Sequence, residues 1–388
     1  MHADRLRALG AFLTETEHLW RPRPFAAEPL TWTAAHPTVA AWAESLDIEA
    51  VEALQEADLD ADGVPVELRG WAREAAALAD VPTLVGSPGR LTPAVDRPAR
   101  GVRGRKWLQV HAFGAVALEL PRPSRWVEWC SGKAHLGRAL GRATGVGLTA
   151  LERDPALCDA GRAAGGDDVL FQAVDVRDPE VADHVPDGAT IVGLHACGEL
   201  SDALVRAAEA RGASLLAAPC CPQKRRGAYV PMSRAGRAVG LELDRPRLLL
   251  AVSGEHVGGG RIRRLRRRSL VWRAAFSALI GEAYHPLPSI PDSGWRGGFR
   301  AFAERWAAHE ERPLPAEWDE DRVLTEAAER VRRSRALGLV RAPFRACLEL
   351  FTVLDRAAWL EEAGRSCDVG RFCPRDVTPR NLVLRSVA

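Results

Sequence analysis

Residues 126–140 read WVEWCSGKAHLGRAL, and this stretch decides the fold. The apolar run around Glu128 predicts a buried strand, and the spacing of Leu136 and Leu140 predicts one face of a helix. Between them, residues 130–133 (CSGK) form a short loop of mostly small residues. A strand, a small-residue loop and a helix in this order are typical of the ligand-binding end of an α/β domain.

The same alternation continues along the chain as far as Lys224. Strand patterns recur at 125–130, 145–153, 169–176, 189–197 and 213–221. Helix patterns lie between them, at 134–144, 154–165, 178–185 and 200–212. Strands that alternate with helices predict a parallel sheet with helices on both faces, a Rossmann-like α/β fold. Ligands of such sheets bind beyond the carboxyl ends of the strands.

The remaining chain suggests two domains. Residues 1–98 are predicted to form a helical N-terminal domain, which ends in a linker rich in glycine and proline at 86–104. Residues 99–388 are predicted to form the sheet domain, with an insertion at about 225–345 that is helical and basic. After the insertion we expect an amphipathic helix at 347–364 and a last strand within 378–388.

Bulk composition excludes several classes of protein. The 388 residues are 47% hydrophobic and carry a net charge of +2, as in an ordinary globular chain. No stretch is long enough to span a bilayer, and the N-terminus lacks the pattern of a signal peptide. The eight cysteines do not have the spacing of a secreted disulfide framework. We therefore expect a cytoplasmic protein with no membrane partner; the sequence leaves the oligomeric state open.

The loop at 130–133 does not match the two commonest nucleotide motifs. The phosphate-binding motif GxxxxGK[ST] needs a glycine where Val127 stands and a hydroxyl residue where Ala134 stands. The dinucleotide motif GxGxxG is broken at Cys130 and Lys133. The loop is therefore predicted to hold neither a nucleoside triphosphate nor a dinucleotide.

An S-adenosylmethionine site fits the pattern better. Glu128-x-Cys130-x-Gly132-x-Ala134 places an acid on the first strand and small residues in the loop, so that the loop can pass under the methionine part of the cofactor without side chains in the way. The sulfonium and ammonium groups of S-adenosylmethionine favour a nearby carboxylate, which a phosphate would avoid. Later strands end in acids placed for the ribose (Glu152) and the adenine amino group (Asp175).

Lysines are rare in this chain, and this draws attention to two further candidates. Among 53 basic residues, only Lys106, Lys133 and Lys224 are lysines, and they lie in the motifs GRKWLQV, CSGKAHLG and CCPQKRR respectively. Lys133 is placed to bridge to the carboxylate of the cofactor or to an acceptor phosphate, and Lys106 to line the same pocket. The predicted cofactor-binding residues are Glu128, Cys130, Ser131, Gly132, Lys133, Glu152, Asp175, Val176, His195 and Lys106.

Four motifs in order carry a family resemblance. They are VEWCSGKAHLGRAL (127–140), GLHACGELSD (193–202), APCCPQK (218–224) and TPRN (378–381). Together they resemble a family of S-adenosylmethionine-dependent methyltransferases that includes glutathione S-transferase C-terminal-domain-containing proteins and methyltransferase-like proteins. More distantly, the H-x-C-G and Cys-Cys motifs are similar to those of tRNA 2′-O-methyltransferases. The resemblance implies a Rossmann-like class I methyltransferase sheet and a methyltransferase activity.

Methyl transfer suggests catalytic residues. His195, at the end of the fourth strand, is the candidate base for a hydroxyl or ammonium acceptor; the alternative is a histidine that is hydrogen-bonded in the sheet edge. Lys133 is a further candidate. The resemblance implies that Arg380 and Asn381, in TPRN, also belong to the site.

The cysteines raise the question of a metal. Cys130, Cys197, Cys220 and Cys221 are expected at one edge of the sheet beside His195, where they offer soft ligands for zinc or an iron–sulfur centre. The C-x-x-C spacing is absent, however, and adjacent cysteines in an extended strand point to opposite faces. Buried thiols that pack around the cofactor account for them equally well, so no metal is predicted.

The acceptor is the least determined feature. The arginine-rich segment 261–273, which includes Trp272, suits an RNA backbone and base stacking, and RNA is the predicted partner. In the alternative, this block pairs with the acidic stretch 316–322. Two other functions remain open: a methyltransferase of a protein or small molecule, and a catalytically inactive protein that binds S-adenosylmethionine or RNA.

Overall fold

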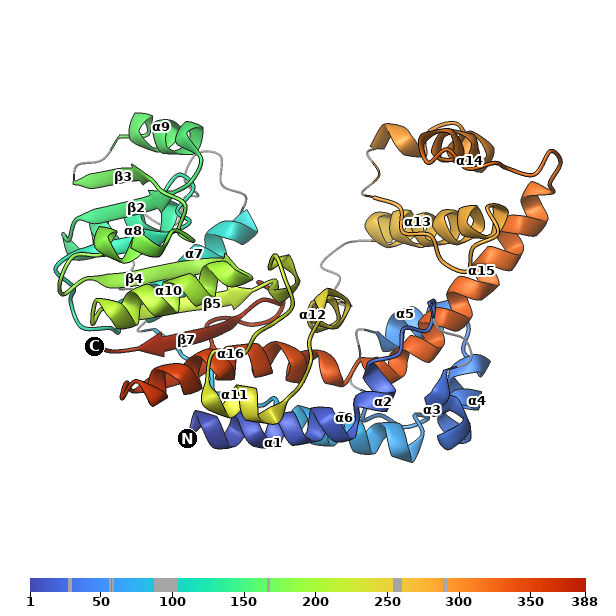
Figure 1. Cartoon of the computed structure of the whole chain (residues 1–388), viewed down its shortest axis with the longest axis horizontal. Coiled ribbons are helices and arrows are strands. Elements are labelled where there is room, and N and C mark those ends of the chain that lie inside the picture. Colours follow the sequence, from blue (N-terminus) through green and yellow to red (C-terminus); the bar gives the residue numbers. More distant parts are fainter. Residues whose placement is uncertain are drawn as a thin grey trace. The chain divides into compact units, whose positions relative to one another are not determined.

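The computed structural model describes residues 1–26, 30–55, 57, 59–86, 104–165, 168–253, 260–288, 290 and 292–388. The chain divides into two compact units (Figure 1). Unit 1 consists of Met1–Glu15, Ala75–Ser253 and Arg345–Ala388, and unit 2 of Thr16–Glu74 and Gly254–Phe344. The predicted boundary at 98/99 and nearly all of the predicted linker 86–104 lie outside the described residues. The two-domain division of the sequence therefore stays a prediction.

Unit 1 contains a seven-stranded sheet in the order β3-β2-β1-β4-β5-β7-β6. The strands are β1 (Trp126–Trp129), β2 (Leu148–Glu152), β3 (Val169–Ala173), β4 (Thr190–Cys197), β5 (Ser214–Cys220), β6 (Cys367–Arg371) and β7 (Leu382–Ser386). The first five are parallel, and β7 is antiparallel to both β5 and β6. The predicted Rossmann-like α/β fold is confirmed, as are the five strands up to Cys220 and the last strand. β6 was not predicted.

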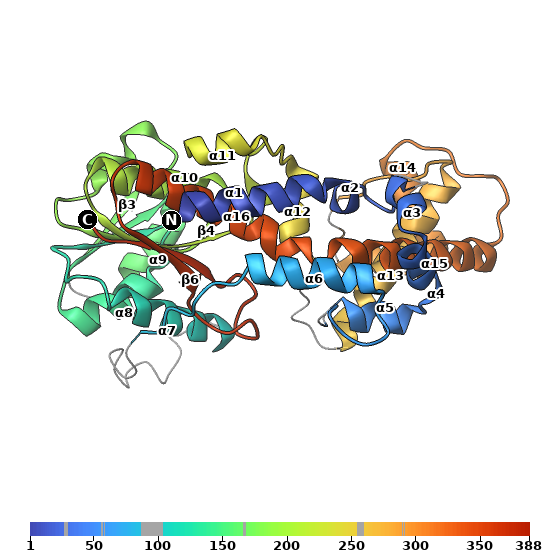
Figure 2. The same cartoon turned by 90° about the horizontal axis from the view of Figure 1, so that it is seen from below.

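Helices cover both faces of this sheet (Figure 2). The helices around the sheet and next to it are α7 (Gly104–Ala117), α8 (His135–Thr144), α9 (Pro155–Ala163), α10 (Glu199–Ala210), α11 (Arg234–Val239), α12 (Arg245–Ala251) and α16 (Phe344–Glu362), with the 3-10 turns η2 (Pro179–His184) and η3 (Pro222–Lys224). α7 and α8 lie on one face, and α10 and α16 on the other. Helix α1 (His2–Glu15) lies alongside α16, where the backbone N–H of His2 donates to the Glu361 carboxylate at 3.0 Å.

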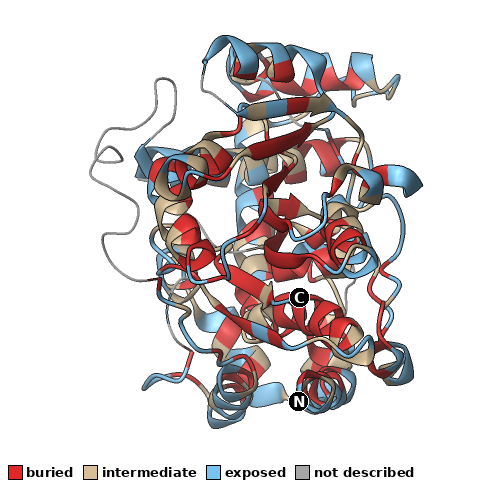
Figure 3. Ribbon diagram, turned by 90° about the vertical axis from the view of Figure 1, so that its left-hand side faces the viewer, coloured by how far each residue is buried: buried red, intermediate tan, exposed pale blue. Residues whose placement is uncertain are grey.

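Local sequence explains why these helices begin where they do. The Asp154 carboxylate accepts from the backbone N–H of Ala156 at 2.9 Å, and Pro155 occupies the first helical position of α9. The strands between the helices are mostly buried (Figure 3). Their side chains alternate between the two faces, so that Trp126 packs toward α7 and α8 while the Trp129 indole N–H donates to Leu200 O at 3.0 Å in α10.

Unit 2 is helical in its described part. Its helices are α2 (Glu17–Trp20), α3 (Thr31–Ala35), α4 (Pro37–Ser45), α5 (Ile48–Leu54), most of α6 (Val66–Leu78), α13 (Gly260–Leu279), α14 (Gly298–His309) and α15 (Glu320–Leu337), with 3-10 turns at η4 (Asp292–Trp295) and η5 (Gly338–Arg341). Phe276, Phe299 and Phe302 form the centre of an apolar cluster between α13, α14 and α15. No described helix is long and apolar enough to cross a membrane.

Candidate active site

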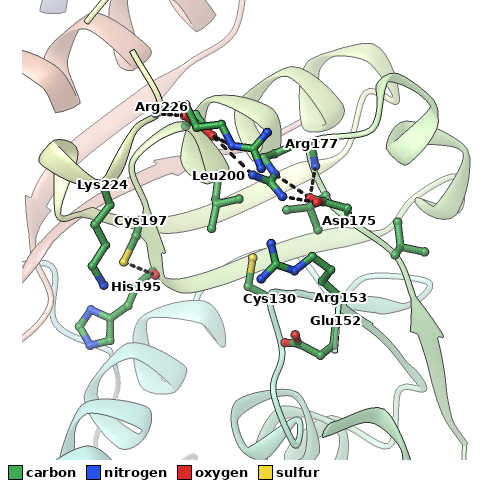
Figure 4. Close-up of a pocket in the computed structure, with 13 residues that line it drawn as sticks. Cys130, Glu152, Arg153, Asp175, Arg177, His195, Cys197, Leu200, Lys224 and Arg226 are labelled. Atoms are coloured by element: carbon green, nitrogen blue, oxygen red, sulfur yellow. Dashed lines mark hydrogen bonds and ion pairs between the residues drawn. The ribbon is translucent and has the colours of Figure 1, made fainter. Parts of the chain in front are cut away.

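A cavity of about 370 Å³ opens at the carboxyl ends of the parallel strands in unit 1 (Figure 4). Its volume is in the range of small-molecule sites, and its place is where the topology predicts a ligand. Five predicted cofactor-binding residues line it: Cys130, Glu152, Asp175, Val176 and His195. The other eight lining residues are outside the predicted cofactor-binding set: Arg153, Val174, Arg177, Cys197, Glu199, Leu200, Lys224 and Arg226.

The backbone at these strand ends adopts unusual conformations. Six non-glycine residues of the described part have positive φ, and four of them belong to this region: Cys130 (52°), Ala134 (58°), His195 (65°) and Cys221 (48°). Side chains other than glycine rarely adopt this left-handed region, which costs on the order of 1 kcal/mol per residue and is concentrated at functional sites. The strand ends are thus held in special positions by the surrounding fold.

Glu152 fastens the loop after β1. The backbone N–H of Gly132 donates to Glu152 Oε2 at 2.8 Å, and that of Asp154 donates to Oε1 at 3.0 Å. Each carboxylate oxygen keeps a second lone pair, which can accept from a ligand hydroxyl. In the same loop the Ser131 hydroxyl is buried and has no hydrogen-bond partner among the described residues.

Glu128 lies away from the cavity, unlike the sequence prediction. It is 7% exposed, and its Oε2 accepts from the backbone N–H of Gly137 at 2.8 Å in α8. A Cβ on Gly137 would lie 2.7 Å from this oxygen, so only glycine permits the contact. Burial raises the pKa of Glu128 to about 8, although the Gly137 hydrogen bond and Lys106 oppose this. Glu128 therefore fixes α8 to β1, as an uncharged carboxyl at neutral pH.

Replacing Glu128 with glutamine is expected to remove a pH dependence of stability. The pKa of the carboxyl is about 8 when folded and ordinarily 4.5, so between these values only the unfolded state loses the proton. The wild-type free energy of unfolding should fall across this range, relative to the free energy of unfolding of Glu128→Gln, by roughly 5 kcal/mol. Urea unfolding at several pH values measures the difference, with the exposed Glu180→Gln as control. Parallel curves for wild type and Glu128→Gln would contradict the assignment.

Asp175 is already bound to a neighbouring side chain. Its carboxylate accepts from Arg177 Nε at 2.8 Å and from a second guanidinium nitrogen. The Arg177 hydrogen bonds lower the pKa of Asp175 to about 2 despite some desolvation. Asp175 is thus a fixed negative charge at the cavity, and its role toward an adenine amino group stays a prediction.

A hydrogen-bond chain orients His195. Gln109 Nε2 in α7 donates to Val377 O at 3.2 Å, so Gln109 Oε1 is the acceptor for His195 Nε2 at 2.7 Å. Nε2 therefore carries the proton, and Nδ1 keeps its lone pair. Burial and the Lys106 and Lys224 ammonium groups lower the pKa of His195 below 6.5, while Cys221 opposes them. The neutral imidazole has the protonation state that a general base needs.

Other predicted site residues do not line this cavity. The Lys106 and Lys133 side chains are exposed on α7 and in the loop before α8. Arg380 donates to Val252 O at 2.6 Å and pairs with Glu349 at 3.5 Å, while Asn381 is buried and donates to Cys373 O at 2.7 Å. These contacts connect the segment before β7 to neighbouring parts of the chain. The resemblance implied that Arg380 and Asn381 lie at the reaction centre, but in the structure neither residue lines the cavity.

Three of the four clustered cysteines lie together. The Sγ atoms of Cys197, Cys220 and Cys221 are all within 4.8 Å of one another, and those of Cys197 and Cys220 are 3.2 Å apart. All eight cysteines are free thiols. Hydrogen bonds from the Cys197 and Cys220 thiols, helped by Lys224 and Arg380, lower the pKa of Cys221 below its usual range, although burial opposes them. Cys130 is outside this group.

Adjacent cysteines were expected to point to opposite faces, and this expectation is wrong for Cys220 and Cys221. It assumes an extended strand, whereas Cys221 has φ 48° and ψ 57° and leaves the strand in a left-handed turn.

Gln109 was also missed, although it lies three residues from Lys106 and so near the same face of α7. That spacing was the signal that could have identified it.

The residues present fit S-adenosylmethionine. The cavity offers carboxylates from the ends of neighbouring strands, and the orphaned Ser131 hydroxyl lies in the adjoining loop. Carboxylates suit a cofactor that carries ribose hydroxyls and two cationic centres. Glu152 and Asp175 would hold the nucleoside part, and His195 would lie toward the acceptor.

Comparison with known families agrees with this chemistry. Residues 106–227 match the family model of a methyltransferase domain, and this range contains every residue that lines the cavity. This part of the chain is therefore similar to a methyltransferase domain, and its fold and the position of its cavity agree with that similarity. A comparison with curated proteins gave no match.

Proposed function

We propose that the chain is an S-adenosylmethionine-dependent methyltransferase that acts on RNA. The observation that supports this most is the cavity at the strand ends, where Glu152, Asp175 and His195 converge within the matched methyltransferase domain. S-adenosylmethionine supplies an electrophilic methyl group for direct displacement. The protein then has to align the acceptor, exclude water and accept a proton.

His195 is the residue proposed to take that proton. Gln109 holds Nε2–H, so the imidazole presents Nδ1 as the basic atom. A hydroxyl acceptor loses its proton as the carbon–oxygen bond forms, and Nδ1 receives it. This agrees with the resemblance to tRNA 2′-O-methyltransferases, which suggests a hydroxyl acceptor.

RNA is proposed as the acceptor because of the arginine-rich part of α13. Five of its arginines are exposed: Arg261, Arg263, Arg264, Arg266 and Arg268. Arg267 instead pairs with Glu49 at 3.0 Å and Glu52 at 2.7 Å in α5. In the acidic stretch 316–322, Glu320 forms an ion pair with Arg300 at 3.7 Å, and another residue of the stretch caps the N-terminus of α15. Exposed guanidinium groups in such a row favour phosphate contacts.

Trp272 has a different place from the one predicted. Its ring packs against Trp295, Phe299 and Phe302 at centroid distances of 5.7, 5.9 and 5.2 Å, inside the aromatic cluster of unit 2. The Arg268 guanidinium lies over the same ring at 5.1 Å. A base-stacking role for Trp272 is therefore not part of the proposal, which depends on the arginines alone.

RNA binding through α13 should depend steeply on salt. Arg261→Gln, Arg264→Gln and Arg266→Gln combined should reduce the slope of log affinity against log salt by about two, at about 0.7 per lost phosphate contact. Filter binding of single-stranded RNA between low and moderate salt measures this slope. The control Arg322→Gln removes a charge already paired with Glu326 at 3.1 Å and should leave the slope unchanged. An unchanged slope in the triple variant would exclude α13 as the RNA surface.

The proposed function itself is tested by methyl transfer. Purified protein is incubated with labelled S-adenosylmethionine and a cell extract divided into RNA, protein and small-molecule fractions. Label in RNA that ribonuclease removes supports the proposal, and the labelled nucleoside identifies the acceptor atom. Label in protein or small molecules would exclude RNA as the acceptor. Cofactor binding without label in any fraction would favour an inactive binder.

A further inference from the structure

We propose that Cys197, Cys220 and Cys221 bind one Zn²⁺ ion and leave its fourth coordination position open. The proposal goes beyond methyl transfer and does not rest on the proposed function. It starts from the position of the three sulfur atoms, all within 4.8 Å of one another beside the cavity.

The spacing of the sulfur atoms suits a tetrahedral ion. Zinc–sulfur bonds of about 2.3 Å place neighbouring ligand sulfurs of a tetrahedral site about 3.8 Å apart. The Cys197–Cys220 distance of 3.2 Å and the limit of 4.8 Å for the group bracket this value. An ion therefore needs only small side-chain shifts to contact all three sulfurs.

The fold, and not chance proximity, brings the three residues together. Cys197 and Cys220 are register partners on the parallel strands β4 and β5, so their side chains share a face of the sheet. Cys221 joins them because its left-handed backbone turns the chain at the end of β5. Two backbone hydrogen bonds of 3.0 Å hold this turn, from Gly198 N–H to Cys220 O and from Lys224 N–H to Cys221 O.

A close approach of the backbone reinforces the arrangement. Gly198 has φ 57°, and a Cβ there would lie 2.9 Å from the backbone nitrogen of Arg225. Only glycine allows the start of α10 to meet the chain that follows the cysteines. A strained and closely packed turn that gathers three thiols is the kind of preorganisation that a metal site requires.

The chemistry of the ligand set selects the ion. Three thiolates favour zinc and other soft metals over magnesium or calcium, which prefer oxygen. Lys224 and Arg380 lie within electrostatic range of Cys221 and offset the net negative charge of a tris-thiolate zinc centre. Binding releases a proton from each thiol that is not yet ionised, with no change of oxidation state.

The open position follows from the number of ligands. Among the described residues, no further histidine, cysteine or carboxylate joins the group within the same distance. Three protein ligands and one exchangeable position are the pattern of a reactive zinc site, whereas structural sites have four. Cys197 also lines the cavity, so the zinc ion would lie beside it.

The test uses the full-length protein, stripped of metal with a chelator under reducing conditions. Zn²⁺ titration should give one equivalent per chain by elemental analysis after desalting. Co²⁺ should give thiolate-to-metal charge-transfer absorption and the intense visible bands of a four-coordinate ion. A small thiol should change the visible bands when it occupies the open position. Less than about one tenth of an equivalent of bound zinc would overturn the proposal, since structural and catalytic zinc sites bind stoichiometrically.

Variants identify the ligands. Cys197→Ser, Cys220→Ser and Cys221→Ser should each weaken zinc binding by at least about 100-fold, because even changes outside the coordination shell cost ~10–100-fold. Cys367→Ala, a buried thiol in β6, is the control and should bind as the wild type does. Unchanged affinity in any of the three serine variants would exclude that residue as a ligand and overturn the three-thiol site.

A measurement on the wild type covers the case in which a variant fails to fold. Alkylation of the native protein followed by peptide mapping should show that zinc protects the half-buried Cys197 and Cys221 but not the half-buried Cys130, while the buried Cys220 stays unlabelled throughout. Equal labelling with and without zinc would overturn the proposal, as would a disulfide between two of the three. S-adenosylmethionine affinity, measured separately, keeps this result distinct from the test of the methyltransferase.

Discussion

His195→Asn should lower kcat for methyl transfer by about 10²–10⁴-fold, the usual contribution of a general base, with S-adenosylmethionine affinity within about threefold of the wild type. Asparagine is chosen because His195 has φ 65°, and asparagine tolerates this left-handed backbone better than most residues. The variant therefore removes the imidazole with little added strain. Single-turnover rates and calorimetric cofactor binding measure the two quantities.

The pH dependence separates a base from a merely structural histidine. Burial holds the pKa of His195 below 6.5, so the wild-type rate should be level above that pH and fall as the imidazole becomes protonated at lower pH. Gln109→Glu places a carboxylate against Nε2–H, which favours the imidazolium and should move the fall to higher pH. Loss of cofactor binding together with activity in His195→Asn would indicate a structural role, and an unchanged rate would exclude the base.

The sheet could be predicted because its signals are local. Each of the first five strands is a short apolar run bounded by helix caps and glycines, and right-handed crossovers leave few arrangements for such units. β6 was missed because CDVGR combines two charges and a glycine, which disfavour a strand outside its tertiary context. Its pairing with β7 supplies the stability that local preference lacks.

The site was harder to predict because it depends on conformations that sequence patterns do not encode. Glu128 was correctly placed on the first strand but was predicted to contact the cofactor, whereas its partner in the structure is determined by how closely Gly137 approaches it. Cys221 would point away from Cys220 in any extended strand, and only its left-handed turn reverses this. Gln109 is 86 residues from His195 in the chain, so their contact becomes visible only when α7 packs near β4. Residues at strand ends were predictable by position, whereas their partners required the fold.

Glu152→Ala should weaken S-adenosylmethionine binding by about 10- to 100-fold, as expected for the loss of hydrogen bonds to a charged group worth ~1.5–3 kcal/mol. The change acts in two ways. It removes a carboxylate that lines the cavity, and it releases the loop that Gly132 N–H fastens to Glu152 Oε2 at 2.8 Å. Glu152→Gln keeps one carbonyl oxygen but turns an amide N–H₂ toward either Gly132 N–H or Asp154 N–H, so it should weaken binding too.

Asp154→Asn is the matched control for the charge. It removes one negative charge two residues from Glu152, while the asparagine oxygen can still accept from Ala156 N–H and cap α9. Cofactor affinity should stay within about twofold of the wild type, because Asp154 is exposed and does not line the cavity, and exposed charges are well screened. Calorimetric titration of all three variants measures the affinities. Equal losses in Asp154→Asn and Glu152→Ala would show that net charge governs binding, whereas an unaffected Glu152→Ala would remove Glu152 from the cofactor site.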